Sequence, residues 1–440
     1  MTTGGYSKMK WRKNIKNTMI ASIVATGLLT VSFTPSLSLA ASKTTITTAS
    51  KTSLYTVKRG DTLYRIAASY KTSVANVKKI NKLKTDTVKI GQKLKVPVVT
   101  SKTPVKTTAP KATEKISPPN PIAYKSVDKE VLGFTVKYNL NDVSSYNIMK
   151  KQHDSLTSIA TATHVVDGNG NIHGTVPAEQ LALANENHIK PTLMVGNEFN
   201  SKVAHQILSS KTNRNRMVNN ILSILQNNGY KGVNIDLENV DDADRNGYST
   251  LIKELSGALK PKGFVLSVSL QPKTSDNPRH TWVYAYDYKT IGKYVDYMLV
   301  MTYDEHYKSS NPGSVASISW VNNVIKYTKS VVPANKILLG VGSYGYDWSL
   351  KGQTKSHSFE EIMEIAKKYK ATIRFDSVSK TPHFSYKDEK GVVHQVWFEN
   401  AQSIAYKLDI IKREGLKGIG IWRLGHNFDD TYWNTIDSKL

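Results

Sequence analysis

Short apolar runs alternate with amphipathic segments through residues 127–440 of the chain. The runs have the composition of buried strands, and the segments between them repeat apolar residues at helical spacing. This alternation predicts an α/β fold with a parallel sheet, and eight strands are the number that closes a (β/α)8 TIM barrel. The expected strands are Val131–Val136, His164–Val166, Lys190–Val195, Gly232–Glu238, Phe264–Leu270, Tyr297–Tyr303, Lys336–Val341 and Gly418–Trp422.

Residues 53–97 carry a different and much shorter pattern. A strand turns at Gly60 into a helix that Thr62 is expected to cap, a second helix spans about Val74–Ile80, and a closing strand follows. A βααβ unit of this size is near the lower limit for unaided folding. Residues 98–126 are rich in proline, threonine and lysine, which predicts a semi-extended linker between this unit and the barrel.

The net charge of +25 is concentrated in the N-terminal part of the chain. Residues 41–126 hold 18 basic and three acidic residues, whereas residues 127–440 hold 37 basic and 32 acidic ones. Residues 1–40 predict export, as described below, and an exported protein meets anionic cell wall or membrane surface before nucleic acid, so we expect no nucleic-acid partner. A solvated lysine-rich surface without a specific partner is the alternative.

Residues 1–40 have the pattern of a signal peptide. Five basic residues come first, Met19–Phe33 is largely apolar, and Ser38–Ala40 offers small residues for cleavage. The apolar core of about 15 residues is short for a membrane span, although an uncleaved anchor is the alternative. No second apolar run is long enough to cross a bilayer, so no stable membrane span is expected after cleavage. The chain has no cysteine, which excludes a disulfide framework.

The segment Gly232–Glu238 ends in two carboxylates, Asp236 and Glu238. Side chains alternate across a strand, so both acids share a face with Asn234, and the apolar residues between them take the other face. Barrels of this kind bury the apolar face under helices and place their chemistry at the carboxyl ends of the strands. Burial and the neighbouring charge would raise the pKa of Glu238, which suits a general acid.

Other polar and aromatic residues come at the ends of other expected strands. Met301 and Tyr303 share a face at the end of the sixth strand, and Asp304 follows them. Trp422 ends the eighth strand after two glycines that leave room inside the barrel. The remaining candidates at the rim are Gln271, after the fifth strand, and Tyr344, after the seventh.

These motifs resemble glycoside hydrolase family 18, the chitinase-type barrels. The family's active-site strand runs Asp-x-x-Asp-x-Asp-x-Glu, and the aligned residues here are Lys231, Asn234, Asp236 and Glu238, so the last two acids match and the first two do not. Met301–Asp304 matches the family's Met-x-Tyr-Asp. The resemblance also implies that the strand-like stretch before the last barrel strand belongs to a small α+β insertion, at about residues 350–400.

The resemblance implies a retaining mechanism in which the substrate's own 2-acetamido oxygen attacks the anomeric carbon. It assigns Glu238 as the acid and base, Asp236 as the group that orients the acetamido group, and Tyr303 as a hydrogen-bond donor to it. Substrate contacts are implied for Trp422, Asp304, Met301, Tyr344, Gln271 and Asn234. No metal or cofactor is required. The uncharged Asn234 should let Asp236 ionise more readily and should alter the pH profile.

The N-terminal unit resembles a LysM module, a family that binds glycans containing N-acetylglucosamine. The matching residues include the Gly60–Leu63 turn and, in and before the closing strand, Gly91-Gln92 and Val96-Pro97. The family's glycan groove implies contacts from Gly60, Asp61, Thr62, Leu63, Ile80 and Asn81. The alternative is that these residues only form tight turns.

Both resemblances imply an exported glycosidase directed at peptidoglycan. An asparagine at position 234 resembles the cortex-lytic and sporulation-specific branch of the family, so we expect an N-acetylglucosaminidase of the spore cortex or cell wall of a Gram-positive bacterium. A hydrolase of chitin oligosaccharides is one alternative, and a catalytically silent wall-binding lectin is another. Intact Glu238, Asp236 and Tyr303 argue against the lectin.

Overall fold

The computed structural model describes residues 52–57, 66, 70, 72, 74–83, 91–97, 124–125, 128–139, 141–426 and 428–440. The chain divides into two compact units, one within residues 1–115 and one within residues 116–440. The expected signal peptide and most of the expected linker lie outside the described residues. Within the described part of the chain, no helix combines the length and the apolar character that a bilayer crossing needs.

The smaller unit contains β1 (Thr52–Thr56), α2 (Val74–Asn81) and β2 (Lys93–Pro97). The two strands pair antiparallel, as the βααβ pattern predicts. Buried residues alternate with exposed ones along β2, so Leu94 and Val96 point into a small core that Val77 of α2 completes. The expected first helix lies outside the described residues apart from a single position.

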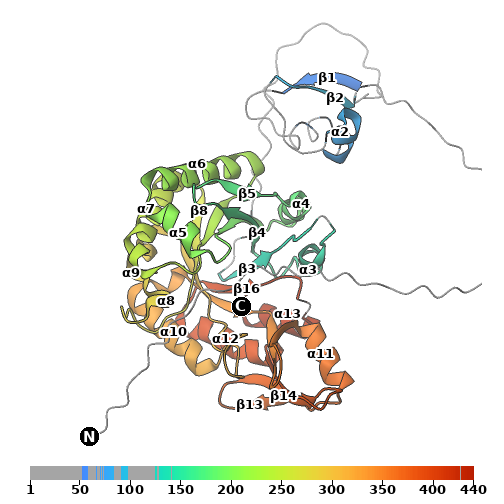
Figure 1. Cartoon of the computed structure of the whole chain (residues 1–440), viewed down its shortest axis with the longest axis vertical. Helices are drawn as coiled ribbons and strands as arrows, with labels where there is room; N and C mark the ends of the chain where they lie inside the picture. The colour runs from blue at the N-terminus through green and yellow to red at the C-terminus, as the bar shows by residue number, and fades with distance from the viewer. Residues whose placement is uncertain are drawn as a thin grey trace, which may run out of the picture. The chain divides into compact units, whose positions relative to one another are not determined.

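The larger unit is a closed barrel of eight parallel strands, as the alternating pattern predicts (Figure 1). Its closure is the pairing between the first and second strands along the chain. A short hairpin strand, β5 (Ile172–Gly174), adds to the second strand through a turn at residues 167–171. The barrel strands in chain order are β3 (Glu130–Thr135), β4 (Ser158–Val166), β6 (Lys190–Gly196), β7 (Gly232–Asp236), β8 (Val265–Leu270), β9 (Tyr297–Val300), β10 (Ile337–Gly342) and β16 (Gly418–Trp422).

Three strands differ from their expected bounds by more than one residue at an end. β4 begins six residues before the expected His164, because a register irregularity between Thr161 and His164 breaks the alternation that marks a strand in the sequence. β7 and β9 end earlier than expected. Shortly after each of these two strands, one residue has a left-handed backbone conformation: Asn239 with φ of 53° after β7, and Asp304 with φ of 61° after β9. Catalytic candidates therefore lie on the turns that follow the strands.

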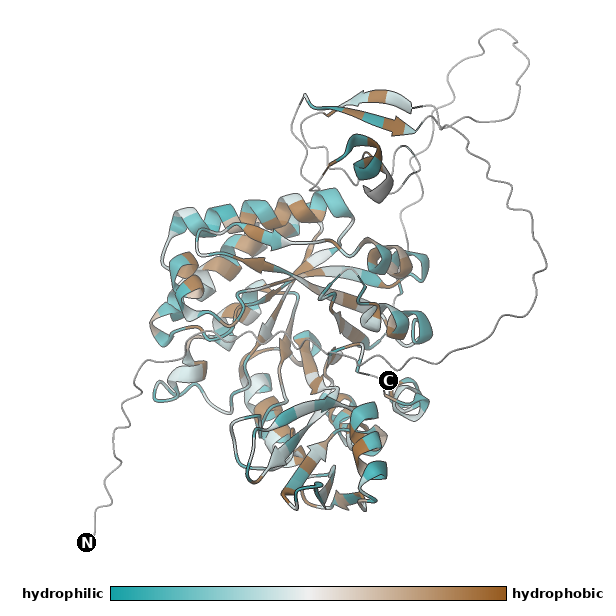
Figure 2. Cartoon of the chain, turned by 45° about the vertical axis from the view of Figure 1, so that its right-hand side comes forward, coloured by the Kyte–Doolittle hydropathy of each residue, from teal (hydrophilic) through white to brown (hydrophobic). Residues whose placement is uncertain are grey.

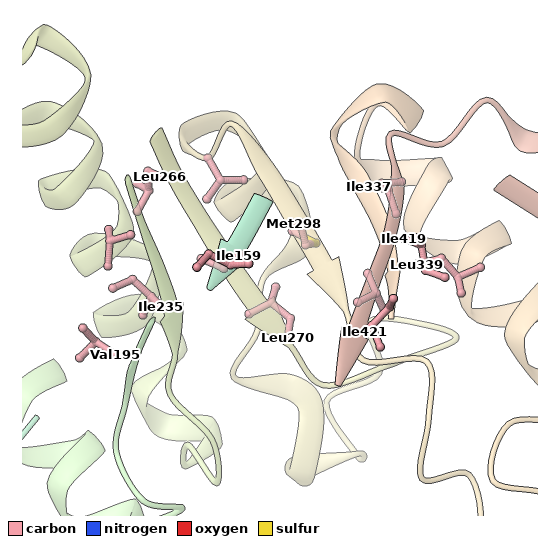
Figure 3. Packing of buried hydrophobic residues seen from close by; sticks show 14 of the residues in the cluster. Ile159, Val195, Ile235, Leu266, Leu270, Met298, Ile337, Leu339, Ile419 and Ile421 are labelled. Atoms are coloured by element: carbon pink, nitrogen blue, oxygen red, sulfur yellow. The ribbon is translucent and has the colours of Figure 1, made fainter. Parts of the chain in front are cut away.

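Two apolar layers line the barrel wall. The outer layer packs the strands against the surrounding helices and includes Val233, Ile235 and Leu237 of the active-site segment, as expected from alternation (Figure 3). The inner layer fills the barrel with residues such as Phe134 and Leu299. Colouring by hydropathy shows the apolar faces of the helices turned toward the sheet (Figure 2). This packing leaves the polar face of β7 inside the barrel.

Helices connect the strands on the outside of the barrel (Figure 1). The longest is held by caps at both ends, because the Ser210 side chain accepts from Asn213 N–H and Gly229 adopts the left-handed conformation. The α-helices are α3 (Ser144–Lys151), α4 (Ala178–Glu186), α5 (Ser201–Leu208), α6 (Lys211–Asn228), α7 (Arg245–Leu259), α8 (Thr281–Tyr284), α9 (Tyr288–Tyr294), α10 (Ile318–Val331), α12 (Ala401–Glu414) and α13 (Asp430–Lys439). The 3-10 helices are η1 (Asp242–Asp244), η2 (Lys260–Lys262) and η3 (Ala334–Lys336).

A small α+β insertion separates β10 from α12, as expected. Its five-stranded antiparallel sheet has the order β12-β11-β15-β14-β13. One helix, with a Ser358–Glu361 capping box, packs on one face of this sheet through Ile362, Phe384 and Phe398. The insertion contains β11 (Tyr344–Ser349), β12 (Lys355–Ser358), α11 (Phe359–Lys368), β13 (Arg374–Asp376), β14 (Thr381–Lys387) and β15 (Val393–Phe398).

Candidate active site

Asp236 and Glu238 lie at the carboxyl end of β7, inside the barrel mouth. Asp236 is the last residue of the strand and is 8% exposed. One of its carboxylate oxygens, Oδ1, is buried without a hydrogen-bond partner among the described residues. Glu238 follows two residues later and is partly buried. An acceptor atom that is buried and unused is costly in a folded protein, so this oxygen calls for an explanation.

The backbone of Glu238 is held by a residue from the neighbouring strand. Asn197, directly after β6, donates from Nδ2 to the Glu238 carbonyl and accepts from the Glu238 N–H, both at 2.8 Å. Its side chain also donates to the Asn200 carbonyl. Asn197 is 2% exposed, so this clamp is shielded from water. The acid is therefore fixed at its own peptide group.

The carboxylate of Glu238 accepts a hydrogen bond from Gln271, with 2.7 Å between Oε2 and Nε2. Gln271 follows β8, and its backbone carbonyl accepts from the Tyr288 hydroxyl at 2.5 Å. The Tyr286 hydroxyl donates to the carbonyl of Leu237, directly before the acid, at 3.1 Å. Tyr288, the first residue of α9, therefore holds the amide partner, and Tyr286, two residues before it, holds the backbone next to the acid.

Both acids have raised pKa values. Burial raises the pKa of Glu238 first, the Asp304 charge adds to this, and the hydrogen bond from Gln271 acts in the opposite direction. The pKa of Asp236 lies well above its usual range because of burial and of the Glu238 charge. Two neighbouring carboxylates that resist ionisation favour a site that holds at least one proton near neutral pH.

Asn234 lies one pleat below Asp236 and is fully buried. Its Nδ2 donates to the Ser267 hydroxyl at 3.1 Å, and its Oδ1 accepts from Ser269 at 2.9 Å. Both amide atoms of Asn234 therefore bind residues of β8. Asn234 supports the acids from below and, being fully buried, is not exposed for the contact with substrate that the resemblance implies. Lys231 lies before β7, with its ammonium group over the ring of Tyr124.

The turn after β9 brings the Met301–Asp304 motif to the same end of the barrel. Asp304 accepts from the hydroxyls of Tyr344 at 2.5 Å and Tyr346 at 3.0 Å. Asp304 is exposed but has many protein atoms around it, so desolvation raises its pKa, against the effect of the two hydroxyl donors. Tyr303 is 9% exposed, and its pKa is raised by burial and by the charges of the acids, so it stays a donor. Met301 is buried beside it.

Trp422 ends β16 and stands on an apolar and polar support. Its ring meets the edge of Phe134 at 5.7 Å between centroids. Ser343 fixes the backbone that follows, because its N–H donates to the Trp422 carbonyl at 2.7 Å and its hydroxyl accepts from Arg423 N–H at 2.8 Å. The indole is partly buried and can present its remaining surface to the cleft.

The fold thus brings Glu238, Asp236, Gln271, Tyr303, Asp304, Tyr344 and Trp422 to one end of the barrel, where the sequence placed them. Sequence reasoning did not find the supporting residues Asn197, Ser343 and Tyr346. It also did not find Phe199 and Trp282, which are 49% and 51% exposed and whose rings lie 5.6 Å apart. Their position after barrel strands is the signal that could have marked them.

The glycan contacts expected in the LysM unit fall mostly outside the described residues, which include neither Gly60 nor the three residues after it. Ile80 and Asn81 close α2. The Asn81 amide donates to the carbonyls of Lys95 and Val77 and accepts from Lys95 N–H, at 2.7 to 2.8 Å. Its side chain therefore joins α2 to β2.

Comparison with known proteins agrees with this geometry. Residues 130–427 match the sequence model for "Glycosyl hydrolases family 18", and residues 55–97 match the model for "LysM domain". The chain is 35% identical over 321 residues to the "Uncharacterized glycosylase YvbX" of Bacillus subtilis, covering 71% of this chain and 93% of that one. It is 31% identical over 409 residues to the "Putative sporulation-specific glycosylase YdhD" of Bacillus subtilis, covering 86% and 97%.

Among solved structures, the Bacillus cereus spore cortex-lytic enzyme SleL superposes with a TM-score of 0.67 at 29% identity, over 88% of this chain and 86% of that one. Motif residues, barrel and site geometry agree with these matches. The chain belongs to glycosyl hydrolase family 18.

Proposed function

We propose that this glycosidase is an exported N-acetylglucosaminidase that cleaves peptidoglycan of the spore cortex or cell wall, with retention of configuration. The observation that carries the proposal is the pairing of Asp236, whose buried Oδ1 has no partner among the described residues, with a Glu238 of raised pKa. The first acid can bind an acetamido N–H, and the second can hold a proton for the leaving oxygen.

In the first step Glu238 gives its proton to the glycosidic oxygen as the bond to the anomeric carbon breaks. The carbonyl oxygen of the sugar's 2-acetamido group forms the new bond to that carbon and gives a cyclic oxazolinium ion. Asp236 accepts from the acetamido N–H and stabilises the positive charge, and Tyr303 donates to the acetamido group. In the second step Glu238, now a carboxylate, removes a proton from water, whose oxygen bonds to the same carbon and opens the ring.

Asp304 is the other acid near Glu238, and its contacts argue against a nucleophilic role. Two tyrosine hydroxyls donate to its Oδ1 and hold its carboxylate against the insertion. Its charge instead raises the pKa of Glu238, which favours the protonated acid that the first step needs. The internal acetamido nucleophile therefore fits this site better than an enzyme carboxylate.

The choice of substrate follows from the same requirement. Muramic δ-lactam of spore cortex has no acetyl group and cannot supply the internal nucleophile, whereas N-acetylglucosamine can. Cleavage is therefore proposed on the reducing side of N-acetylglucosamine. Similarity to the spore cortex-lytic enzyme SleL and to the "Putative sporulation-specific glycosylase YdhD" supports this substrate.

Two aromatic platforms and three N-terminal segments complete the proposed design. Trp422 gives the apolar face of the sugar a platform at the cleaved bond, and the exposed Phe199–Trp282 pair offers a second one at the rim. Residues 1–40 direct export, and the LysM module at residues 53–97 holds the enzyme on glycan while the linker at 98–126 lets the barrel reach neighbouring strands.

The test is digestion of muramic-δ-lactam peptidoglycan fragments by the purified full chain, with mass spectrometry of the new reducing ends. New N-acetylglucosamine ends that are absent with Glu238→Gln would support the proposal. Cleavage of chitin oligosaccharides alone would make the protein a chitin-type hydrolase. Binding without cleavage of either substrate would make it a lectin.

A further inference from the structure

The sheet of the insertion presents one row of side chains that starts at the active site. Arg374 of β13 pairs with His383 of β14, His383 pairs with Trp397 of β15, and Trp397 pairs with Tyr346 of β11. Residues directly opposite each other on paired strands share a face of the sheet, so these four side chains form a line across four strands. At a strand spacing of about 4.8 Å the line is about 14 Å long.

The line lies on the face of the sheet that α11 does not cover. Ile362 and Ala366 of the helix pack against Phe384, Val396 and Phe398, which alternate with the row and point the opposite way. At its inner end, Tyr346 donates to Asp304, so the row begins at a residue of the candidate active site. A glycan held at the acids can therefore extend along this face.

The outer members of the row are hydrogen-bond donors that the protein does not use. Arg374 is exposed, and His383 and Trp397 are partly buried, with their rings stacked at 4.4 Å. None of the described residues accepts a hydrogen bond from the Arg374 guanidinium, the His383 ring or the Trp397 indole N–H. Asp376 lies two residues from Arg374. Its carboxylate accepts from Val378 N–H at 3.1 Å and Ser379 N–H at 2.5 Å, and it also interacts electrostatically with His383.

We propose that the Tyr346–Trp397–His383–Arg374 row is an extension of the substrate site that binds the free lactyl carboxylate of a muramoyl unit, one whose carboxyl is not tied up in a lactam or in a peptide link. Arg374 pairs with this carboxylate, His383 and Trp397 donate hydrogen bonds to the same sugar, and the proposal rests on the proposed peptidoglycan substrate. A guanidinium presents a planar fork of donors that matches a carboxylate. Chitin has no such anion, so the row distinguishes the two glycans.

The test measures binding of glycan strands with free lactyl carboxylates to the full chain in a Glu238→Gln background, which prevents turnover. The matched ligand is the same glycan with its carboxylates converted to neutral amides. Arg374→Gln is expected to raise the Kd about tenfold for the free carboxylate and to leave the Kd for the amide unchanged. His383→Gln is expected to act in the same direction with a smaller effect.

Lys387→Gln is the control, because Lys387 is an exposed cation on the same face of β14, four residues from His383. It should leave both Kd values unchanged, and LysM binding is common to all variants. Equal losses on both glycans, or no loss with Arg374→Gln, would overturn the proposed row. If Arg374→Gln weakens binding of the free carboxylate alone, but the wild-type enzyme cleaves no peptidoglycan, the result would instead overturn the proposed function.

Discussion

Replacing Asn197 by alanine would remove the clamp on the backbone of the catalytic acid. The substitution deletes both amide atoms that bind the Glu238 N–H and the Glu238 carbonyl at 2.8 Å, together with the bond to the Asn200 carbonyl. It leaves the Glu238 carboxyl group and its hydrogen bond to Gln271 in place. Any loss of activity would therefore come from position rather than from chemistry.

The contacts give the size of the effect. A hydrogen bond contributes about 0.5–1.5 kcal/mol net, and a buried group left without a partner costs about 1–3 kcal/mol. Since Asn197 is 2% exposed and both Glu238 backbone groups lose their partner, the barrel should lose about 2–4 kcal/mol of its free energy of unfolding. This is less than a typical total of about 5–15 kcal/mol, so the variant should fold. A displacement of Glu238 by about 1 Å would lower kcat roughly 100-fold.

Urea unfolding followed by tryptophan fluorescence measures the first quantity, because six of the seven tryptophans lie within residues 127–440. Turnover of cortex fragments at a temperature where the variant is folded measures the second. The control is Asn187→Ala, which removes a single side-chain hydrogen bond, to the Leu183 carbonyl, away from the site. If the two variants lose equal stability and Asn197→Ala keeps its kcat, the clamp does not position the acid.

Three further predictions concern the same site. Gln271→Leu removes a hydrogen bond that favours the Glu238 carboxylate, so the pKa of the acid rises and the alkaline limb of kcat/KM moves to higher pH; an unchanged or lowered limb would contradict this. Tyr288→Phe should move the limb the same way, and the double variant should add little to Gln271→Leu. Glu238→Gln should raise Tm at pH 8 but not at pH 4. The pKa of Glu238 is raised in the folded protein, so the acid is easily tolerated while it is protonated at low pH and destabilises the fold once it ionises at high pH. The neutral glutamine removes this cost.

The barrel was predictable because its pattern is local. Each strand is a short apolar run, and the alternation of strands with helices allows few arrangements other than a closed parallel barrel. The exception is β4, whose polar Ser158–Thr163 portion gives no apolar run, since a bulge and the barrel interior accept small polar side chains there. Its true start depends on pairing with β3 and β6, which a single strand cannot reveal.

The catalytic residues were predictable for a related reason. Asp236, Glu238 and the Met301–Asp304 motif each lie in one continuous segment with recognisable spacing. The residues that support them come from other segments. Asn197 meets Glu238 across 41 positions of sequence, and Ser343 meets Arg423 across 80. The residue type of Asn197 or Ser343 does not indicate a role at the active site, because an asparagine or serine after a strand is usually part of a turn.

The sequence by itself determined the fold class, the strand that carries the acids and the family, because side-chain alternation and motif spacing are properties of neighbouring residues. Only the tertiary structure decided which groups surround those acids. Burial, the Asp304 charge and the Gln271 hydrogen bond together set the pKa of Glu238, and the row from Tyr346 to Arg374 exists only once four strands are in register. Electrostatics and recognition act through space, so they depend on contacts that the order of residues along the chain does not state.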